Sequence, residues 1–340
     1  METCIKKYTE IGIKDIGEVG YKNASIGKTM HHLAHNGVLT PAGFAITASA
    51  YRHFISENKL ELPLKYLMAA LDTKDYTNLE ELSGRARKII MDGRMPTELG
   101  LEIMDAYDYL FDLTEAAVAV RSSAVSDHLA DAAAIGLNHS IFNVKGHCAL
   151  LYAIRQCFAS LYSDKAVRHA AEKGYDPCAA AMSIAIQQMV RADKGCSGVG
   201  YTHDPRTNVK DTIYIKAILG LGELINRISV KTDEYRVSKH SLQTSTLLVE
   251  KARGDQQQIM VFADEDDETN QTVLKDIPKG LQQGYVLNDK EIRRLAEWGL
   301  LLDDVYKNPV CFEWAKDGEN HQLYLIQVSP APSQNHPANL

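Results

Sequence analysis

The chain has 340 residues, of which 45% are hydrophobic and 24% charged, enough to bury one large core or the cores of two or three modest lobes. Lysine and arginine number 37 against 44 aspartates and glutamates, which gives a formal charge of -7. This acidic balance argues against a protein that coats nucleic acid or an anionic membrane through its overall field. A local basic pocket for a small phosphate is compatible with it.

The six cysteines are scattered, and none forms a CxxC pair or a zinc-like cluster with histidines. We therefore expect reduced thiols and a cytoplasmic protein. The N-terminal residues lack the apolar core of a signal peptide, and no stretch of about 18 apolar residues could span a bilayer. We expect neither a membrane nor a nucleic acid as a partner.

The first third of the chain is predicted to be mostly helical. Apolar residues recur at helical spacing over residues 22–36, and Gly37 is a plausible helix stop. A turn at residues 39–43 leads into a short apolar run. Residues 47–115 are expected to be largely helical, with a polar break at Asp92-Gly93.

From residue 116 the pattern changes to short apolar runs that end in polar residues. Residues 116–120 predict a buried strand that delivers Arg121 and two serines at its tip. Helical periodicity returns over about 147–172. Further apolar or strand-like segments follow at residues 180–190, 197–202 and 213–219.

The last third begins with the least regular and most polar segment, residues 252–285, whose acidic run at 264–268 we interpret as a solvated loop. Asn288 and Glu291 form a capping box ahead of a predicted helix. Two strands at 310–315 and 323–328 are predicted to form a hairpin. Because strands and helices alternate and polar groups sit at strand ends, the pattern indicates an α/β or α+β architecture.

Four groups of motifs occur in order along the chain. They are residues 19–27 with Pro41-Ala42-Gly43-Phe44; residues 120–124 continuing through Asp131-Ala132 and Gly136 to Phe142-Asn143-Val144; residues 157–162 with 188–191 and 197–199; and Gly220-Leu221-Gly222-Glu223 with residues 233–235, 313–318 and Gln327. Each group alone is weak, but together they are collinear over about residues 10–330.

These motifs resemble the amino-terminal ATP-grasp domain of the phosphoenolpyruvate synthase and pyruvate phosphate dikinase family. The resemblance implies an α+β protein with the ATP-grasp fold: two mixed α/β lobes, a nucleotide cleft and a flexible lid. We expect an N-terminal lobe over residues 1–205, which includes the lid at about 116–146, and a C-terminal lobe over residues 206–340. ATP and Mg²⁺ are the implied cofactors.

The resemblance also implies roles for individual residues. Cations offset the charge of a triphosphate and guide the leaving phosphate, and hard oxygen ligands suit magnesium. The implied set comprises Lys22 and Arg121 as catalytic cations on the phosphates, the backbone of Gln188, Met189 and Val190 on the adenine edge, and Glu313 and Gln327 as ligands of magnesium and phosphate. Without the resemblance, a lone lysine before an amphipathic helix, such as Lys22, is more often just solvated, and residues 188–190 have the alternative interpretation of a buried apolar strand end.

Several positions depart from the family pattern. Cys311 stands where relatives have an acidic residue, and Ser329 where a Gln-x-Arg-Pro pattern has an arginine. A thiol is a poor magnesium ligand, and a serine does not replace a charged guanidinium. The lid stretch 131–140 has lost several polar side chains. Arg227 or Lys231 is a candidate to compensate for the arginine.

The resemblance covers an ATP domain, and none of the twelve histidines lies in a segment like the phosphohistidine motif. Our leading hypothesis is therefore an ATP-binding subunit of a split dikinase, which phosphorylates a histidine on a partner subunit and leaves AMP and phosphate. This organisation is similar to that of phenylphosphate synthase. The alternatives are a catalytically degenerate domain that acts as a regulatory or scaffolding partner, a piece of an ordinary synthase, and a small-molecule kinase or ligase that acts alone.

Overall fold

Two compact units make up the structure, a computed structural model that describes residues 3–111, 116–125, 139–207, 209–225, 230–244, 247–263, 272–280 and 282–331. The first unit comprises the residues up to Lys28 together with Ala42–Met189, and the second comprises Thr29–Pro41 together with the residues from Val190 onward. Residues 190–205, which the expected boundary after residue 205 assigned to the N-terminal lobe, are grouped with the second unit in this division. Strand β6 (Cys196–Tyr201) is the reason, because it pairs with β7 and β12 in the sheet of the second unit.

An antiparallel five-stranded sheet forms the centre of the first unit, in the order β1-β2-β5-β3-β4. Its strands are β1 (Ile5–Lys7), β2 (Gly43–Ile46), β3 (Val118–Val125), β4 (Ser140–Val144) and β5 (Ala181–Gln188). The middle strand β5 is buried on both faces along its length until Gln188, which is exposed. The chain therefore turns to solvent at the end of this strand.

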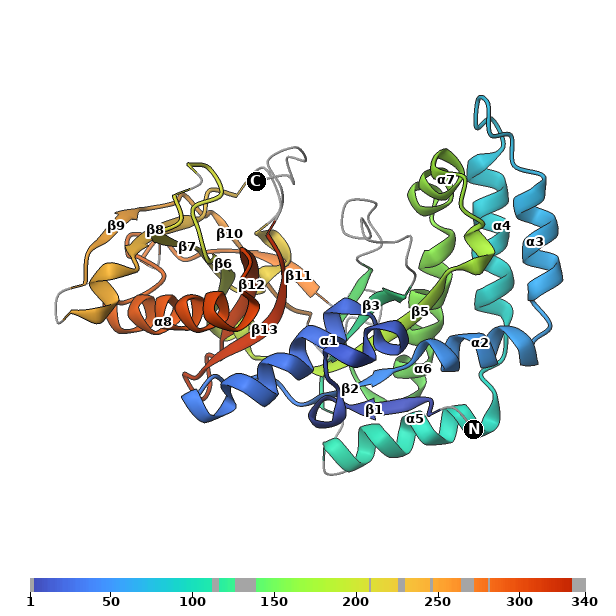
Figure 1. The fold of residues 1–340 in the computed structure, drawn as a ribbon, viewed down its shortest axis with the longest axis horizontal. Helices are drawn as coiled ribbons and strands as arrows, with labels where there is room; N and C mark the ends of the chain where they lie inside the picture. The colour runs from blue at the N-terminus through green and yellow to red at the C-terminus, as the bar shows by residue number, and fades with distance from the viewer. Residues whose placement is uncertain are drawn as a thin grey trace. The chain divides into compact units, whose positions relative to one another are not determined.

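Among the described residues, seven α-helices lie between or beside the strands of this sheet along the chain, as can be followed in Figure 1. They are α1 (Ile16–Leu33), α2 (Ala48–Glu57), α3 (Glu61–Ala69), α4 (Leu79–Asp92), α5 (Thr97–Leu110), α6 (Gly146–Ala159) and α7 (Asp164–Lys173). The helical prediction for residues 47–111 is confirmed by α2 to α5. Helix α7 begins at the N-cap Ser163 and ends at Gly174, whose φ of 71° suits a residue without a Cβ.

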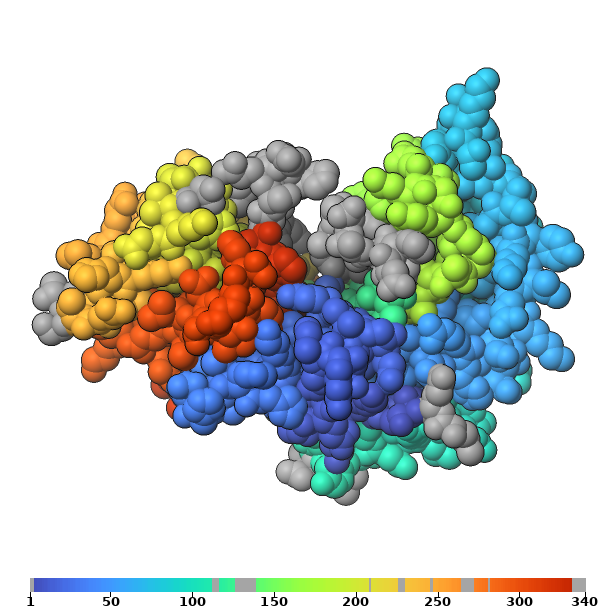
Figure 2. All heavy atoms as spheres, viewed as in Figure 1, coloured from blue at the N-terminus to red at the C-terminus, as the bar shows by residue number. Residues whose placement is uncertain are grey.

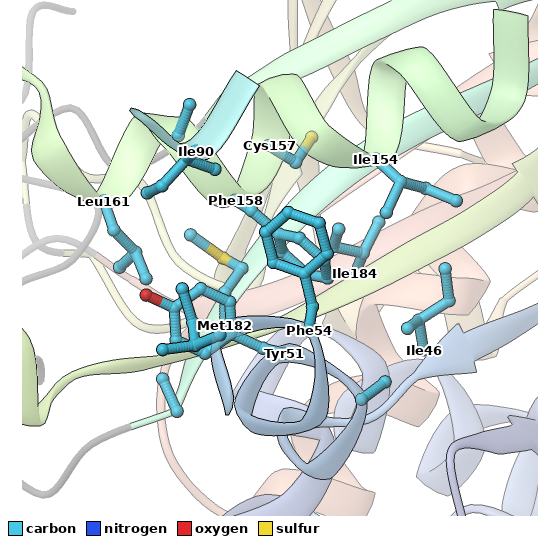
Figure 3. Close-up of a cluster of buried hydrophobic side chains, with 14 of the residues drawn as sticks. Ile46, Tyr51, Phe54, Ile90, Ile154, Cys157, Phe158, Leu161, Met182 and Ile184 are labelled. Atoms are coloured by element: carbon cyan, nitrogen blue, oxygen red, sulfur yellow. The ribbon is translucent and has the colours of Figure 1, made fainter. Parts of the chain in front are cut away.

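The core of the first unit lies between the sheet and helices α2 and α6. Figure 3 shows side chains of these helices gathered around β5, among them Tyr51, Phe54, Ile154, Cys157 and Phe158 beside Met182 and Ile184. The Phe158 ring lies 5.1 Å from the Tyr51 ring and 5.4 Å from the Phe54 ring, centroid to centroid. This aromatic packing fixes α6, and with it the buried Cys157, against the sheet.

The second unit holds an antiparallel six-stranded sheet in the order β13-β12-β6-β7-β8-β9 and a separate hairpin of β10 and β11. In addition to β6, its strands are β7 (Thr212–Leu219), β8 (Asp233–Ser238), β9 (Val249–Ala252), β10 (Gln258–Phe262), β11 (Thr272–Asp276), β12 (Val310–Lys316) and β13 (Leu323–Pro330). The predicted closing hairpin is confirmed by β12 and β13. No strand was predicted within residues 252–285, but β10 and β11 form there. The acidic run 264–268 lies outside the described residues.

One long helix, α8 (Asp289–Tyr306), covers one face of this sheet. The predicted capping box is present, since Asn288 Oδ1 accepts from the Lys290 and Glu291 amides and Glu291 caps the Asn288 amide. Buried Trp298 and Leu302 of α8 belong to the same core as Phe312 of β12. In the space-filling view, the orange and red stretch containing α8, β12 and β13 forms part of the viewed face of this unit (Figure 2).

Because side chains alternate along each strand, Lys216 and Glu313 lie on the opposite face from the buried core residues Ile215, Ala217 and Phe312. The predicted mixture of helices and strands is confirmed. Among the helices of the described residues, none is both long enough and apolar enough to cross a bilayer.

Candidate functional site

The seven predicted site residues fall into two groups, one in each unit. Lys22, Arg121, Gln188 and Met189 belong to the first unit, and Val190, Glu313 and Gln327 belong to the second. Each group is described within its own unit.

Lys22 is held against strand β3 by a kink in α1. Gly20 interrupts the helix with φ 72° and ψ 167°, and a Cβ at this position would lie 2.3 Å from Ser123 Oγ. A side chain is excluded both by that approach and by the positive φ. Beyond the kink, Lys22 Nζ donates a hydrogen bond of 3.0 Å to the carbonyl oxygen of Ser122. Gly20 therefore allows a new helical segment, which carries Lys22, to begin beside Ser122 and Ser123 of β3.

Arg121 lies on that same strand, opposite Ala185 of β5 and Ser140 of β4. Its neighbours on the strand are buried, whereas Arg121 itself is half-buried. Burial raises the pKa of Tyr8, and the nearby charge of Arg121 opposes that rise. Burial likewise raises the pKa of Cys157 to about 12, and Lys22 opposes it. The structure thus brings the two predicted cations together, one on the strand and the other bonded to the next residue along it.

The predicted adenine-binding linker begins where β5 ends. The Gln188 amide donates to Ala42 O and the Met189 amide to Ala117 O, both at 2.9 Å. Gln188 lies opposite Val118, three residues along the strand pair from Arg121, which corresponds to about 10 Å. The amide of Val190, by contrast, donates no hydrogen bond to a described residue. Among the backbone amides of Gln188, Met189 and Val190, only that of Val190 has no hydrogen-bond acceptor in the described part of the chain.

The turn Asp317-Gly318 of the closing hairpin holds the segment that follows this linker. Asp317 accepts hydrogen bonds from the amides of Arg191, Glu319 and Asn320 at 3.1, 2.8 and 3.0 Å. The Gly318 amide donates to Arg191 O at 3.0 Å. A Cβ on Gly318 would meet Lys194 O at 2.2 Å, so this contact requires glycine. The Asp-Gly motif therefore fixes the backbone next to Val190.

Loss of the Asp317 carboxylate is expected to loosen that segment. Burial by itself raises the pKa of Asp317, but the three amide donors and the charge of Arg191 outweigh it and hold the pKa below its ordinary value of 3.8. We expect Asp317→Ala to lower the free energy of unfolding by about 3 kcal/mol at pH 7. Because the folded-state pKa is depressed, this stabilisation is complete above about pH 4 and is lost as pH falls further.

Urea unfolding of the wild-type chain and of Asp317→Ala between pH 7 and pH 3 measures both effects. The difference between the two proteins should shrink below about pH 4. A difference that stays constant with pH would contradict a role for the ionised carboxylate.

Glu313 and Gln327 face each other across the closing hairpin. They are register partners on β12 and β13, with a bulge immediately after Glu313. Gln327 is 7% exposed, and Glu313 is half-buried. A carboxylate and an amide oxygen on adjacent strands suit Mg²⁺, which binds proteins through one or two carboxylates and completes its shell with water and substrate phosphates. These two residues therefore fit the implied metal.

Cys311 and Ser329 form the next register pair along the same face. Burial raises the pKa of the Cys311 thiol to about 12, and the charge of Glu313 raises it further. The sulfur is therefore a neutral thiol at pH 7, which is not the form that binds metals. Among the described residues, no group of three or more His, Cys, Asp or Glu side chains could hold a metal ion by itself.

A lysine that sequence analysis missed lies in the same row of side chains. Glu313 is opposite Val199 of β6, and Val199 is opposite Lys216 of β7, so Lys216 and Glu313 are on one face of the sheet. Lys216 Nζ makes no hydrogen bond or ion pair with a described residue. The signal in the sequence is a single lysine within the apolar run Ile213–Leu219.

The remaining charges on this face are paired among themselves. Arg206 Nη2 forms an ion pair with Glu234, the register partner of Lys216 on β8. Arg236 Nε lies 3.0 Å from Asp204 Oδ2 and its Nη2 lies 3.6 Å from Glu234. Burial is the main cause that lowers the pKa of Lys216, and Glu234 opposes it from beside the arginines.

The other predicted elements are only partly described. Of the lid expected over about 116–146, the two ends form strands β3 and β4, and residues 126–138 lie outside the described residues, as does Arg227. Where the lid segment ends, the His139 amide donates to Ser122 Oγ at 2.9 Å, which fastens it to β3. Lys231 is exposed, and its carbonyl oxygen accepts from the Asp255 amide at the edge of β8, away from the row of Glu313 and Gln327.

A pocket of about 550 Å³ in the first unit contains none of the seven residues. It lies beside α4, α6 and α7, and its charged groups Arg87 and Asp164 form an ion pair of 2.8 Å with each other.

Comparisons with known proteins agree on one family. Residues 16–339 match the family described as "Pyruvate phosphate dikinase, AMP/ATP-binding domain". Phosphoenolpyruvate synthases of Aquifex aeolicus, Synechocystis sp. and Escherichia coli are 37%, 35% and 33% identical to the chain, over 94%, 96% and 95% of its length. These alignments cover 38%, 42% and 41% of the relatives, so the chain spans about two fifths of their length.

Proposed function

Since this chain belongs to the pyruvate phosphate dikinase AMP/ATP-binding domain family, we propose that it binds Mg-ATP and supplies phosphate to a histidine on a partner domain or subunit. The ATP-grasp fold is part of this proposal, because the family implies it. The observation that carries the proposal is the pairing of matched groups: Lys22 bonded beside Arg121, and Glu313 opposite Gln327.

The first pair is suited to phosphate oxygens. Two cations, Arg121 within β3 and Lys22 bonded to the next residue of that strand, would stabilise the charge that moves between oxygens during phosphoryl transfer. The helical segment that restarts after Gly20 adds the partial positive charge of its N-terminus beside Lys22. Because the kink and the bond to Ser122 O hold the lysine in place, little reorganisation is needed when a phosphate arrives.

Glu313 and Gln327 would hold magnesium in this site. The metal, when bound, would neutralise charge on the phosphates. With Cys311 as a neutral thiol, Glu313 is the one carboxylate of the pair of strands that the proposal assigns to the metal. The adenine edge is assigned to the Val190 amide, since the Gln188 and Met189 amides bond within the sheet. The spacing of about 10 Å between Gln188 and Arg121 along β3 and β5 is one that a nucleoside with its phosphates can bridge.

The overall reaction that we propose consumes ATP, water and a partner histidine and yields AMP, inorganic phosphate and phosphohistidine. The named relatives are phosphoenolpyruvate synthases, and an organisation like that of phenylphosphate synthase is one form that a divided enzyme would take. The final phosphate acceptor would bind to other parts of the complex.

A second candidate function is a regulatory or scaffolding domain that binds nucleotide without transferring phosphate. The neutral Cys311 thiol and Ser329, at positions where relatives have charged groups, favour it. Purifying the chain together with its associated proteins and incubating the complex with ATP labelled on the α-phosphate, and in a parallel reaction on the β- and γ-phosphates, separates the two. The dikinase proposal requires labelled AMP and an acid-labile phosphohistidine on the partner. Binding of Mg-ATP without either product would favour the scaffold.

A further inference from the structure

The row of side chains on the second unit contains one cation that the described part of the chain leaves without an ion pair. Lys216 lies on the same sheet face as Glu313 and Gln327, in the register Gln327–Glu313–Val199–Lys216. Two strand spacings separate Lys216 from Glu313, or about 10 Å between Cα atoms. The flexible four-carbon stem of lysine can cover much of that distance.

The surroundings of Lys216 keep its charge available. Its register partner Glu234 is ion-paired with Arg206 and contacts Arg236, and thus is already balanced by two guanidinium groups. Across Val199, the carboxylate in register with Lys216 is that of Glu313, which the proposed function assigns to the metal.

The position of the Lys216 ammonium matters because Ser329 contributes no charge to this face of the sheet. Ser329 lies beyond Gln327 on the same face, opposite Cys311, and carries only a hydroxyl. Burial also lowers the pKa of Lys216, which means that its ammonium is poorly solvated and would gain from an anionic partner. We propose that Lys216 supplies the positive charge of the second unit toward the nucleotide phosphates, in place of the arginine that position 329 lacks. This inference rests on the proposed nucleotide site and deepens it.

The inference distinguishes Lys216 from the two residues that the sequence suggested for the same task. Lys231 is at the edge of β8, outside the row, and Arg227 lies outside the described residues. Lys216, in contrast, shares a register row with Glu313 and Gln327, on the face where these two would hold the metal and its phosphates. A cation there would contact the β- or γ-phosphate, and AMP, which has neither, would not meet it.

Calorimetric titration of Mg-ATP and of AMP into the full chain tests this assignment. We expect Lys216→Met to weaken Mg-ATP binding about tenfold or more, the size of a lost hydrogen bond to a charged group, while AMP binding changes by less than about twofold. Lys216→Arg keeps the charge and should retain most of the affinity. Lys210→Met, which removes an exposed lysine shortly before β7, is the charge-matched control and should bind like the wild type.

Three outcomes would overturn the inference alone. They are unchanged Mg-ATP affinity in Lys216→Met, an equal loss of ATP and AMP affinity that Lys216→Arg fails to rescue, and a loss in Lys231→Met that Lys216→Met does not show. Failure of the unchanged chain to bind Mg-ATP, alone or with its partner, refutes the proposed function as well. Thermal unfolding without ligand confirms that each variant is folded.

Discussion

Glu313→Gln should make ATP binding insensitive to magnesium and lower AMP formation by the complete complex about 100-fold or more. The substitution keeps the size and one oxygen of the side chain but removes its charge. Because Cys311 is a neutral thiol, no carboxylate in the neighbouring register pair replaces it. Magnesium prefers anionic oxygen ligands, and losing a group that stabilises transferred charge commonly costs 10²–10³ in rate.

The control for this variant is Glu250→Gln, which removes one carboxylate from β9 in the same sheet. Glu250 is 73% exposed at its side chain and lies at the far edge from Glu313, so its loss should leave both measurements unchanged. Titrating ATP at several magnesium concentrations gives the metal dependence of the two variants and the wild type. An unaltered magnesium dependence in Glu313→Gln would remove this residue from the metal site.

Lys22→Met is expected to have the second-largest effect, weakening Mg-ATP binding about tenfold and AMP formation about 100-fold. The larger effect on turnover follows because charge moves toward the bridging oxygen as the phosphate leaves, and a fixed cation binds that state more tightly. Lys22 is held by the Gly20 kink and by Ser122 O, so its ammonium is fixed before the nucleotide binds.

Lys14→Met provides the matched loss of charge, since Lys14 is exposed and lies just before α1. Binding is measured by calorimetry and turnover by release of labelled AMP from the complex. If Lys22→Met and Lys14→Met behave alike in both assays, the lysine of α1 acts only as a solvated side chain.

The elements that sequence analysis predicted well are those defined by local chemistry. The Asn288 and Glu291 capping box depends on residues three apart, and the closing hairpin on a short turn between two alternating strands; both are present. Hydrophobic runs located β3, β5 and β7, because a buried strand needs little more than apolar residues of the right length.

What depends on distant parts of the chain was not predictable in this way. The division at Val190 results from the pairing of β6 with β12, which lies more than 100 residues further along. Lys216 becomes a candidate only once β6 pairs with both β7 and β12, which puts Lys216 on the same sheet face as Glu313. Its neighbours in the sequence of β7 are mostly apolar and do not point to a binding site. Gly20 belongs to a motif that can be recognised in the sequence, but its close approach to Ser123 becomes apparent only in the folded structure.

The resemblance to a family located seven residues, and the structure places them within two separate units. Two pairs are adjacent, Lys22 with Arg121 and Glu313 with Gln327, each through contacts or register inside its own unit. The lid residues 131–138 stay an expectation, because they lie outside the described residues. The further rise in the pKa of Cys311 is a feature that composition could not reveal, since it arises from burial.

Calorimetric titration of ATP into the purified chain, with and without magnesium, tests the central claim most directly. The account predicts binding that strengthens with magnesium and weakens in both Lys22→Met and Glu313→Gln. Absence of binding at millimolar ATP, in the presence of magnesium and of the partner protein, would contradict it and identify the chain as an interaction module.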